Sequence, residues 1–214
     1  MSLKVVVIGA TGVVGSQVVE ALIKHVAIKE VVTLTRKPVQ YNSTKVLNVV
    51  INFEEIESYS KLLEADILFS CLGTTLKQAR SLEAQKKVDV TYQYKVAKIA
   101  SEQGITNYSL VSSSGANVKS SNAYLQMKGE LESLVLKLNF SKVSIFQPSL
   151  LLGKRSDLRV GELIGKYILP VLCFIPGLKK YAPIKGEVVA KKMLEVALNN
   201  EVGVNYYRLD EISC

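Results

Sequence analysis

Short apolar runs alternate along the chain up to Pro148 with longer segments in which apolar and polar residues recur at helical spacing. The short runs are rich in β-branched residues and predict strands buried in a parallel sheet. They lie at residues 4–8, 30–35, 46–51, 66–71, 108–112 and 143–147. The longer segments predict helices at residues 12–25, 56–63, 84–103 and 124–138. This alternation predicts the α/β class, with a doubly wound parallel sheet of the Rossmann type.

Beyond Pro148 the pattern is less regular. Residues 163–178 are strongly apolar but contain Lys166, Pro170, Pro176 and Gly177, whereas a transmembrane helix needs about 20 unbroken apolar residues. We therefore expect no transmembrane segment, and we expect residues 153–183 to form a small irregular region that covers the substrate. A contact with a membrane surface is the weaker alternative. The length of 214 residues and the lack of a linker predict a single domain over residues 1–214.

A glycine-rich segment joins the first predicted strand to the first predicted helix. Gly9 permits a tight turn, Gly12 lets backbone N–H groups approach a pyrophosphate, and Gly15 allows close packing of helix and strand. A phosphate there would also meet the positive end of the helix dipole. A turn that merely connects the two elements is the weaker interpretation, because strand, turn and helix follow in the required order. We predict that the whole segment contacts a dinucleotide: Gly9, Ala10, Thr11, Gly12, Val13, Val14 and Gly15.

The end of the second predicted strand bears on the choice of cofactor. An NAD site usually has an acidic residue here that binds the ribose 2′-hydroxyl, but this strand ends in Thr35, Arg36 and Lys37. The guanidinium of Arg36 can form a forked contact with a 2′-phosphate. The alternative is a solvated pair of surface cations. We predict that Arg36 and Lys37 favour NADP over NAD.

Tyr124 and Lys128 are four residues apart in a predicted helix and therefore share a face. A phenol with its ordinary pKa of about 10 transfers protons poorly at neutral pH, and an adjacent ammonium group favours its ionised form. Ser112, Ser113 and Ser114 end the fifth predicted strand, where a hydroxyl can bind a substrate carbonyl. A simple strand-to-loop turn is a serious alternative for the serines.

The segments GATGVVG, CLGTT, SSSGA and YLQMK together resemble the short-chain dehydrogenase/reductase superfamily. The longer segments LVSSSGAN, SSNAYLQMKGELE and IFQPSLLLG resemble its atypical, Tat-interacting-protein-like oxidoreductases, over nearly the whole chain. Many extended members carry an asparagine where this chain has Asp89, so a proton relay that needs that amide is not carried over.

The resemblance implies roles for individual residues. Ser113 matches the superfamily serine, Tyr124 is the proton donor or acceptor, and Lys128 holds the nicotinamide ribose. The remaining implied cofactor contacts line the ribose or close over the nicotinamide: Leu72, Gly73 and Thr74, then Pro148, Ser149, Leu150 and Leu151.

Charge and cysteine content exclude some functions. The net charge of +8 favours phosphorylated ligands, nucleic acid or an anionic membrane, but the lysines are scattered, so we expect a solvated basic surface and no nucleic-acid groove. The single histidine, His25, and the lack of clustered carboxylates predict no metal site and no Ser-His-Asp hydrolase. Three widely spaced cysteines and no secretory cleavage site predict a cytoplasmic protein.

These observations predict an NADP-dependent oxidoreductase that transfers a hydride between the nicotinamide and a small carbonyl or alcohol substrate. One alternative is a non-catalytic, NADP-binding redox sensor that acts through a protein partner. A nucleotide-sugar epimerase or dehydratase is disfavoured, because the region after Pro148 is short for a sugar-nucleotide domain. The substrate is not predicted, and a homo-oligomer stays open.

Overall fold

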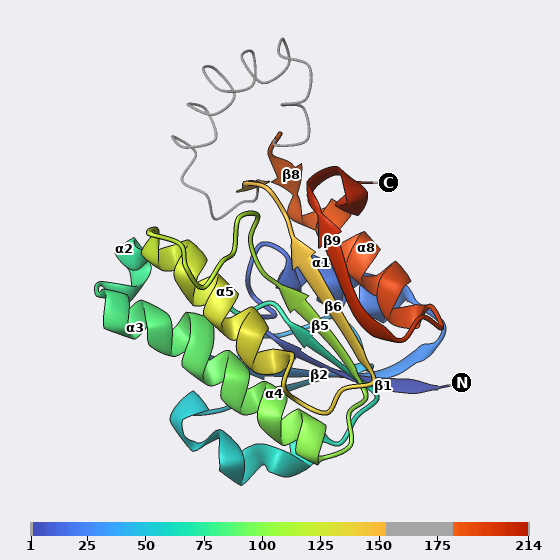
Figure 1. Ribbon diagram of the computed structural model, residues 1–214. Coiled ribbons are helices and arrows are strands. Elements are labelled where there is room, and N and C mark those ends of the chain that lie inside the picture. The colour runs from blue at the N-terminus through green and yellow to red at the C-terminus, as the bar shows by residue number, and fades with distance from the viewer. Residues whose placement is uncertain (1, 153–181, 214) are drawn as a thin grey trace.

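The computed structural model describes residues 2–152 and 182–213 (Figure 1). In this part of the chain seven parallel strands form a sheet in the order β3-β2-β1-β4-β5-β6-β9. The strands are β1 (Leu3–Ile8), β2 (Ile28–Thr35), β3 (Val46–Val50), β4 (Ile67–Ser70), β5 (Asn107–Val111), β6 (Lys142–Gln147) and β9 (Gly203–Arg208). The chain order reverses between β1 and β4, and ligands of open parallel sheets bind beside such a reversal.

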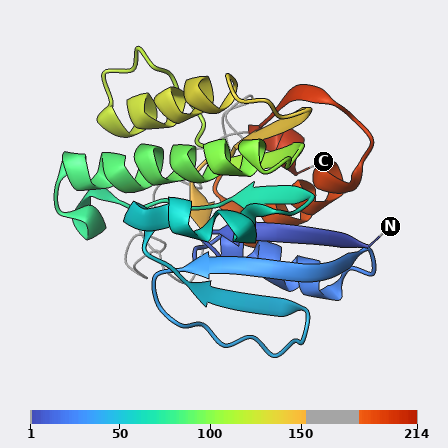
Figure 2. The ribbon, with the colours of Figure 1, turned by 90° about the horizontal axis from the view of Figure 1, so that it is seen from below.

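Helices cover both faces of the sheet (Figures 1 and 2). Helix α1 (Gly15–Lys24) and helix α8 (Gly186–Leu198) pack together on one face. The other face is covered by η1 (Phe53–Leu63), by α4 (Gln93–Glu102) and by α5 (Ala123–Val135). The fold class is therefore the predicted doubly wound α/β sheet.

Alternation along β1 shows why the sheet is buried on both sides. Val5 and Val7 lie in the core beneath α1 and α8, whereas Val6 and Ile8 lie in the core beneath α4 and α5. All four side chains are completely buried. An unbroken apolar run, here Val5 to Ile8, suits this position, because successive side chains point to opposite faces.

The shorter elements lie between the main ones or near the C-terminus. Helix α2 (Leu76–Ala79) follows β4, and η5 (Leu209–Ile212) follows β9. A separate two-stranded sheet pairs β7 (Leu151–Leu152) with β8 (Ile184–Lys185). This pairing places Leu151 and Leu152, which follow β6, beside the two residues that directly precede α8.

The six predicted strands and the four predicted helical segments are confirmed, with shifted boundaries. Helix α1 begins at Gly15 rather than residue 12, because the preceding residues form the glycine-rich turn. The segment predicted as an α-helix at residues 56–63 is instead a 3₁₀ helix over Phe53–Leu63. Helix α8 and strand β9 were not predicted, and β9 is an edge strand with no fully buried residue. The predicted covering segment falls almost entirely on residues 153–181, outside the described residues.

The long helix predicted at residues 84–103 contains an irregularity that sequence periodicity did not predict. It consists of α3 (Leu82–Lys86), a π-helical turn η2 (Lys87–Tyr92) and α4. Wider turns of this kind insert a residue into the helical register and often occur at functional sites. Asp89 lies in the π turn and is completely buried.

Candidate cofactor and active site

The glycine-rich turn between β1 and α1 has room only for glycine at two positions. Gly9 has a φ of +76°, and a Cβ there would lie 2.3 Å from the backbone carbonyl of Cys71. A Cβ on Gly15 would lie 2.2 Å from the carbonyl oxygen of Gly9. The Gly12 N–H closes the turn by donating to that same oxygen at 2.9 Å. The turn is therefore held against the end of β4.

The start of α1 fits a diphosphate. The residue that precedes the helix, Val14, makes no side-chain capping hydrogen bond, so a bound anion does not compete with a carboxylate or hydroxyl cap. The first turn carries no acidic residue. Small residues and the positive helix end together form a site where a dinucleotide's phosphates can approach the backbone.

A cavity of about 640 Å³ lies on one side of this turn, beneath the end of β2. None of its lining residues is acidic, and Arg36 and Lys37 stand exposed at its rim. It is lined by Gly9, Ala10, Thr11, Gly12, Leu34, Thr35, Arg36, Lys37, Val39, Cys71, Leu72 and Gly73. Its position suits the adenosine half of a dinucleotide.

A second cavity of about 290 Å³ lies on the other side, toward β5 and α5. It shares Gly12, Cys71, Leu72 and Gly73 with the first cavity, so the two form one crevice along the carboxyl ends of the strands. Its other lining residues are Val13, Val14, Thr74, Thr75, Gln78, Asp89, Val111, Ser112, Tyr124, Lys128 and Leu151. The predicted tyrosine and lysine thus face the same crevice as the predicted cofactor loop.

Helix α5 places Tyr124 and Lys128 one turn apart. The Asn122 side chain accepts hydrogen bonds from the N–H groups of Tyr124 and Leu125, which fixes the start of the helix. The Lys128 ammonium lies 5.7 Å from the centre of the Tyr124 ring. Tyr124 is 37% exposed and Lys128 only 3%. The phenol can therefore reach a substrate while the ammonium stays behind it.

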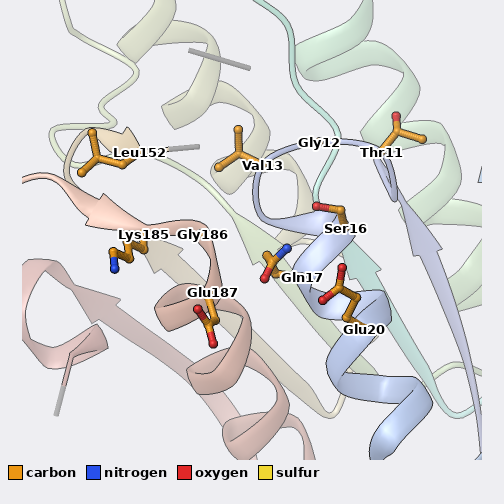
Figure 3. Close-up of a pocket in the computed structure, with 10 residues that line it drawn as sticks. All are labelled: Thr11, Gly12, Val13, Ser16, Gln17, Glu20, Leu152, Lys185, Gly186 and Glu187. Carbon is orange, nitrogen blue, oxygen red and sulfur yellow. The ribbon is translucent and has the colours of Figure 1, made fainter. Parts of the chain in front are cut away.

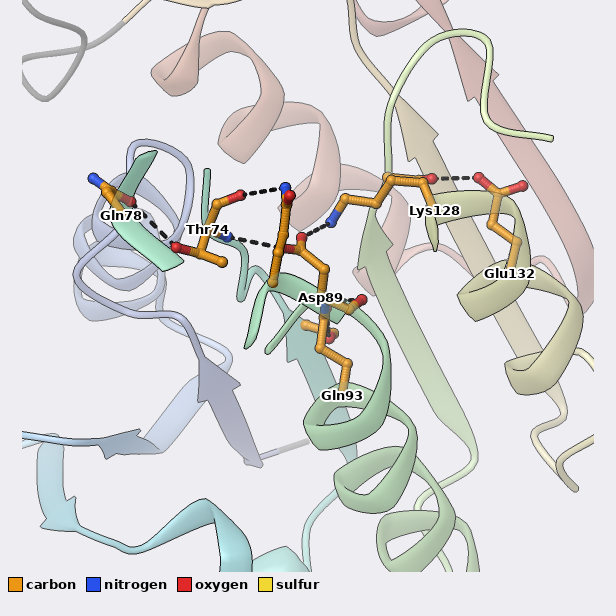
Figure 4. A network of polar contacts seen from close by, with 9 residues as sticks. Thr74, Gln78, Asp89, Gln93, Lys128 and Glu132 are labelled. Atoms are coloured by element: carbon orange, nitrogen blue, oxygen red, sulfur yellow. Dashed lines mark hydrogen bonds and ion pairs between the residues drawn. The ribbon is translucent and has the colours of Figure 1, made fainter. Parts of the chain in front are cut away.

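Asp89 joins Lys128 to the loop that follows β4. Its Oδ1 lies 2.8 Å from the Lys128 Nζ, and its Oδ2 accepts a hydrogen bond from the Thr74 N–H at 3.1 Å (Figure 4). The backbone of the π turn is held in place by Gln93, whose side-chain amide donates to the Asp89 carbonyl. Gly73 leaves space for this arrangement, since a Cβ there would lie 3.4 Å from Asp89 Oδ1.

The surroundings of Lys128 keep it cationic. Burial alone would lower its pKa, but the ionised form of Tyr124 and the carboxylates of Asp89 and Glu132 outweigh burial, and the pKa of Lys128 is raised above its ordinary value. An ammonium at this position is what a proton-transferring phenol needs beside it.

Of the three candidate serines, Ser112 is the one that lines the cavity. Its hydroxyl donates to the buried carboxylate of Glu132, which also accepts from the Gln147 amide at 2.9 and 3.1 Å. The Ser113 hydroxyl instead contacts the carbonyl of Ser114 at 3.5 Å. Which hydroxyl meets the substrate stays a prediction.

Sequence reasoning did not identify Glu132 as a member of this site. The signal was present, because Glu132 lies four residues after Lys128 and eight after Tyr124, and such spacings place side chains on one helix face. Its hydrogen-bond partners are Ser112, directly after β5, and Gln147 at the end of β6, and local spacing does not specify this meeting.

The predicted contacts at residues 148–151 divide in two. Leu151 lines the cavity beside Tyr124. Pro148 instead accepts a backbone hydrogen bond from Ser114, Ser149 donates to the Ala182 carbonyl, and the Leu150 carbonyl accepts from Ile184. Pro148 is thus bonded to the loop after β5, and Ser149 and Leu150 are bonded to residues 182–184 at the start of β8. The contact of these three residues with a nicotinamide stays a prediction.

A third cavity, of about 630 Å³, opens on the far side of the glycine-rich turn (Figure 3). It lies between the starts of α1 and α8, and Lys185, Glu187 and Glu20 contribute charged side chains to it. A Cβ on Gly186 would lie 2.4 Å from the Val13 carbonyl oxygen. The start of α8 is therefore packed directly against the turn.

Cys71 lies at the junction of the two halves of the crevice, and we expect its thiol to react slowly. Burial raises the pKa of Cys71 to about 12, so almost none of it is the nucleophilic thiolate at neutral pH. In a variant with serine at positions 173 and 214, we expect iodoacetamide to alkylate Cys71 about a hundredfold more slowly than free cysteine at pH 8. Mass spectrometry over time measures this rate, and labelling as fast as free cysteine would contradict it.

Residues 2–152 and 182–213 lack two features that would suggest other functions. No helix there has the length and apolar character that crossing a membrane requires. Nor do three or more metal-binding side chains gather at any point there.

The glycine-rich turn, the crevice at the strand ends and the Tyr124–Lys128 pair define a dinucleotide-binding protein with a Rossmann fold. A family described as NAD(P)H-binding matches residues 9–141. The chain belongs to this family, among the atypical short-chain dehydrogenases/reductases.

Curated relatives agree with this assignment. Protein FMP52, mitochondrial, of Candida albicans is 35% identical over 96% of this chain and 91% of its own length. Protein HTATIP2 of Rattus norvegicus is 32% identical over 76% of this chain and 68% of its own length. The second relative supports the resemblance to Tat-interacting-protein-like oxidoreductases.

Solved structures share the fold at low sequence identity. MoeE5 in complex with UDP-glucuronic acid and NAD superposes with a TM-score of 0.74 at 15% identity, over 96% of this chain and 76% of that chain. The structure titled putative NAD-dependent epimerase/dehydratase from Bacillus halodurans superposes with a TM-score of 0.69 at 20% identity, over 95% of this chain and 92% of that chain. At such identities the likeness concerns the fold alone.

The prediction of a cytoplasmic location is contradicted by the relatives. Four of them, 34–36% identical to this chain, are named mitochondrial. The cysteine content argued only against an oxidising compartment, and the missing cleavage site only against a secretory signal. Neither criterion selects the cytoplasm.

Proposed function

We propose that this protein is an NADP-dependent oxidoreductase that transfers a hydride between the nicotinamide and a small carbonyl or alcohol. The observation that carries the proposal is the convergence of Tyr124, Lys128 and Ser112 on the crevice that begins at the glycine-rich turn. A bound nicotinamide supplies or accepts the hydride. The names of the relatives further lead us to propose a mitochondrial location.

The side chains of this site would handle the proton and orient the substrate. Tyr124 is the proposed donor of a proton to the substrate oxygen during reduction, and the acceptor during oxidation. Lys128 favours the ionised phenol by its charge and is the proposed contact of the nicotinamide ribose. A serine hydroxyl of the run after β5, Ser112 or Ser113, would orient the substrate oxygen toward Tyr124.

The preference for NADP rests on charge at the adenosine half of the crevice. Arg36 and Lys37 are exposed at its rim, and no acidic residue lines it. An acidic side chain would bind a ribose 2′-hydroxyl and repel a 2′-phosphate, whereas a guanidinium binds the phosphate through paired hydrogen bonds.

Replacing Arg36 by alanine tests this preference. We expect Arg36→Ala to weaken NADP binding about ten- to a hundredfold, since it removes a charge-assisted contact, while NAD affinity stays within about twofold. Isothermal titration calorimetry with both dinucleotides measures the two Kd values. Arg80→Ala is a matched control, because Arg80 lines neither half of the crevice. Equal losses for NAD and NADP would count against a 2′-phosphate contact.

Turnover is tested with NADPH and a panel of aldehydes, ketones and quinones. Oxidation of NADPH, followed by its absorbance, with at least one member of the panel is the expected result. Tight binding of NADPH without turnover of any carbonyl would favour the redox sensor over the enzyme.

A further inference from the structure

Three ionisable side chains lie buried together around the second cavity, the half of the crevice toward β5 and α5. Asp89 and Lys128 line the cavity, and Glu132 lies directly behind Ser112. Asp89 is fully buried, while Lys128 and Glu132 are 3% and 7% exposed. Two carboxylates and one ammonium leave this group with an excess of one negative charge.

The excess charge belongs to Glu132. The ammonium of Lys128 is already paired with Asp89 at 2.8 Å, whereas the partners of Glu132 are the neutral Ser112 hydroxyl and the neutral Gln147 amide. Arg208 reaches only the far side of Gln147, where its Nε donates to Oε1 at 3.1 Å. Because Arg208 is exposed, water and salt screen its charge more strongly than they screen the buried groups.

We propose that Asp89 and Glu132 bias this half of the crevice toward the oxidised dinucleotide, whose nicotinamide ring is cationic. The inference rests on the proposed function, since it requires the nicotinamide to lie near Tyr124. It concerns which redox form is bound more tightly, and it holds for an enzyme or for a sensor.

The physical reason is the difference between the two redox forms. The oxidised and reduced dinucleotides share their phosphates, riboses and adenine, and they differ in one positive charge on the nicotinamide ring. A buried negative charge attracts that ring more strongly than an exposed one, because little water lies between them. A lone Lys128 would repel the cationic ring, and the paired Asp89 cancels that repulsion.

The test is the ratio of two dissociation constants. The Kd values of NADP⁺ and NADPH are measured by calorimetry and fluorescence for the wild type, Glu132→Gln and Asp89→Asn. We expect each variant to bind NADP⁺ about five- to tenfold more weakly relative to NADPH, the effect of removing one nearby charge at a protein-like dielectric. If NAD binds more tightly than NADP, the same ratio is measured with NAD⁺ and NADH.

Both substitutions keep side-chain size and an acceptor oxygen, and Glu130→Gln is the matched control. Glu130 lies two residues before Glu132 on α5, but its side chain is only partly buried and is paired with Lys86 at 2.9 Å, so its replacement should leave the ratio unchanged. If Asp89→Asn loses the hydrogen bond to Thr74, the binding of both redox forms should weaken equally, and the ratio of their Kd values should not change for this reason.

Unchanged ratios in Glu132→Gln and Asp89→Asn would overturn the proposal, as would an equal change in Glu130→Gln. If one variant does not fold, as judged by circular dichroism, the ratio in the other decides. A wild type that binds neither dinucleotide would instead disprove the proposed function itself.

Discussion

Tyr124→Phe is expected to lower kcat for carbonyl reduction by about 10²- to 10⁴-fold, the usual contribution of a positioned proton donor. The substitution removes the phenolic oxygen from the exposed edge of the crevice and leaves the ring in place. Because Lys128 keeps its ion pair with Asp89, the affinity for the dinucleotide should stay within about threefold. Steady-state kinetics with NADPH and the best carbonyl of the panel measure kcat, and calorimetry measures the affinity.

Tyr59→Phe is the control for this substitution. Tyr59 lies on η1 and lines neither half of the crevice, so its loss of a hydroxyl should not change kcat. Turnover by Tyr124→Phe at the wild-type rate would mean that another group moves the proton. A fall in kcat that is matched by weaker dinucleotide binding would mean that Tyr124 serves the cofactor instead.

Gly9→Ala is expected to lower the free energy of unfolding by about 2–5 kcal/mol, the sum of left-handed strain and overpacking. The φ of +76° strains any residue with a Cβ, and this Cβ would collide with the rigid backbone of Cys71 and Leu72. For a domain of this size the melting temperature should fall by roughly 10 °C. Urea denaturation and thermal melts measure the two quantities.

Gly104→Ala separates strain from collision. Gly104 has a φ of +88°, but a Cβ there would meet no atom within 4 Å. Gly104→Ala should therefore lower the free energy of unfolding by only about 1 kcal/mol. Equal losses at the two positions would show that β4 moves aside at Gly9, and that the turn is less tightly held than its geometry indicates.

Much of the fold could be predicted because it depends on local patterns. Apolar runs such as that of β1 are typical of strands buried on both faces, and the glycine-rich segment follows directly from one of them. The four-residue spacing of Tyr124 and Lys128 is likewise a local property of one helix. By contrast, β9 pairs with β6 across more than fifty residues. Because β9 lies at the edge of the sheet and has no fully buried residue, its sequence contains no apolar run that would predict a strand.

The sequence by itself determined the alternation of strands and helices, the turn that fits a diphosphate, the missing acidic residue after β2 and the pairing of Tyr124 with Lys128. Only the tertiary structure decided that Asp89 meets Lys128, that Ser112 rather than Ser113 lines the cavity, and that Glu132 lies behind it. The first set depends on residues within a few positions of each other, where backbone periodicity fixes their relation. The second depends on a π turn and on side chains from different strands, and their relation exists only once the sheet has formed.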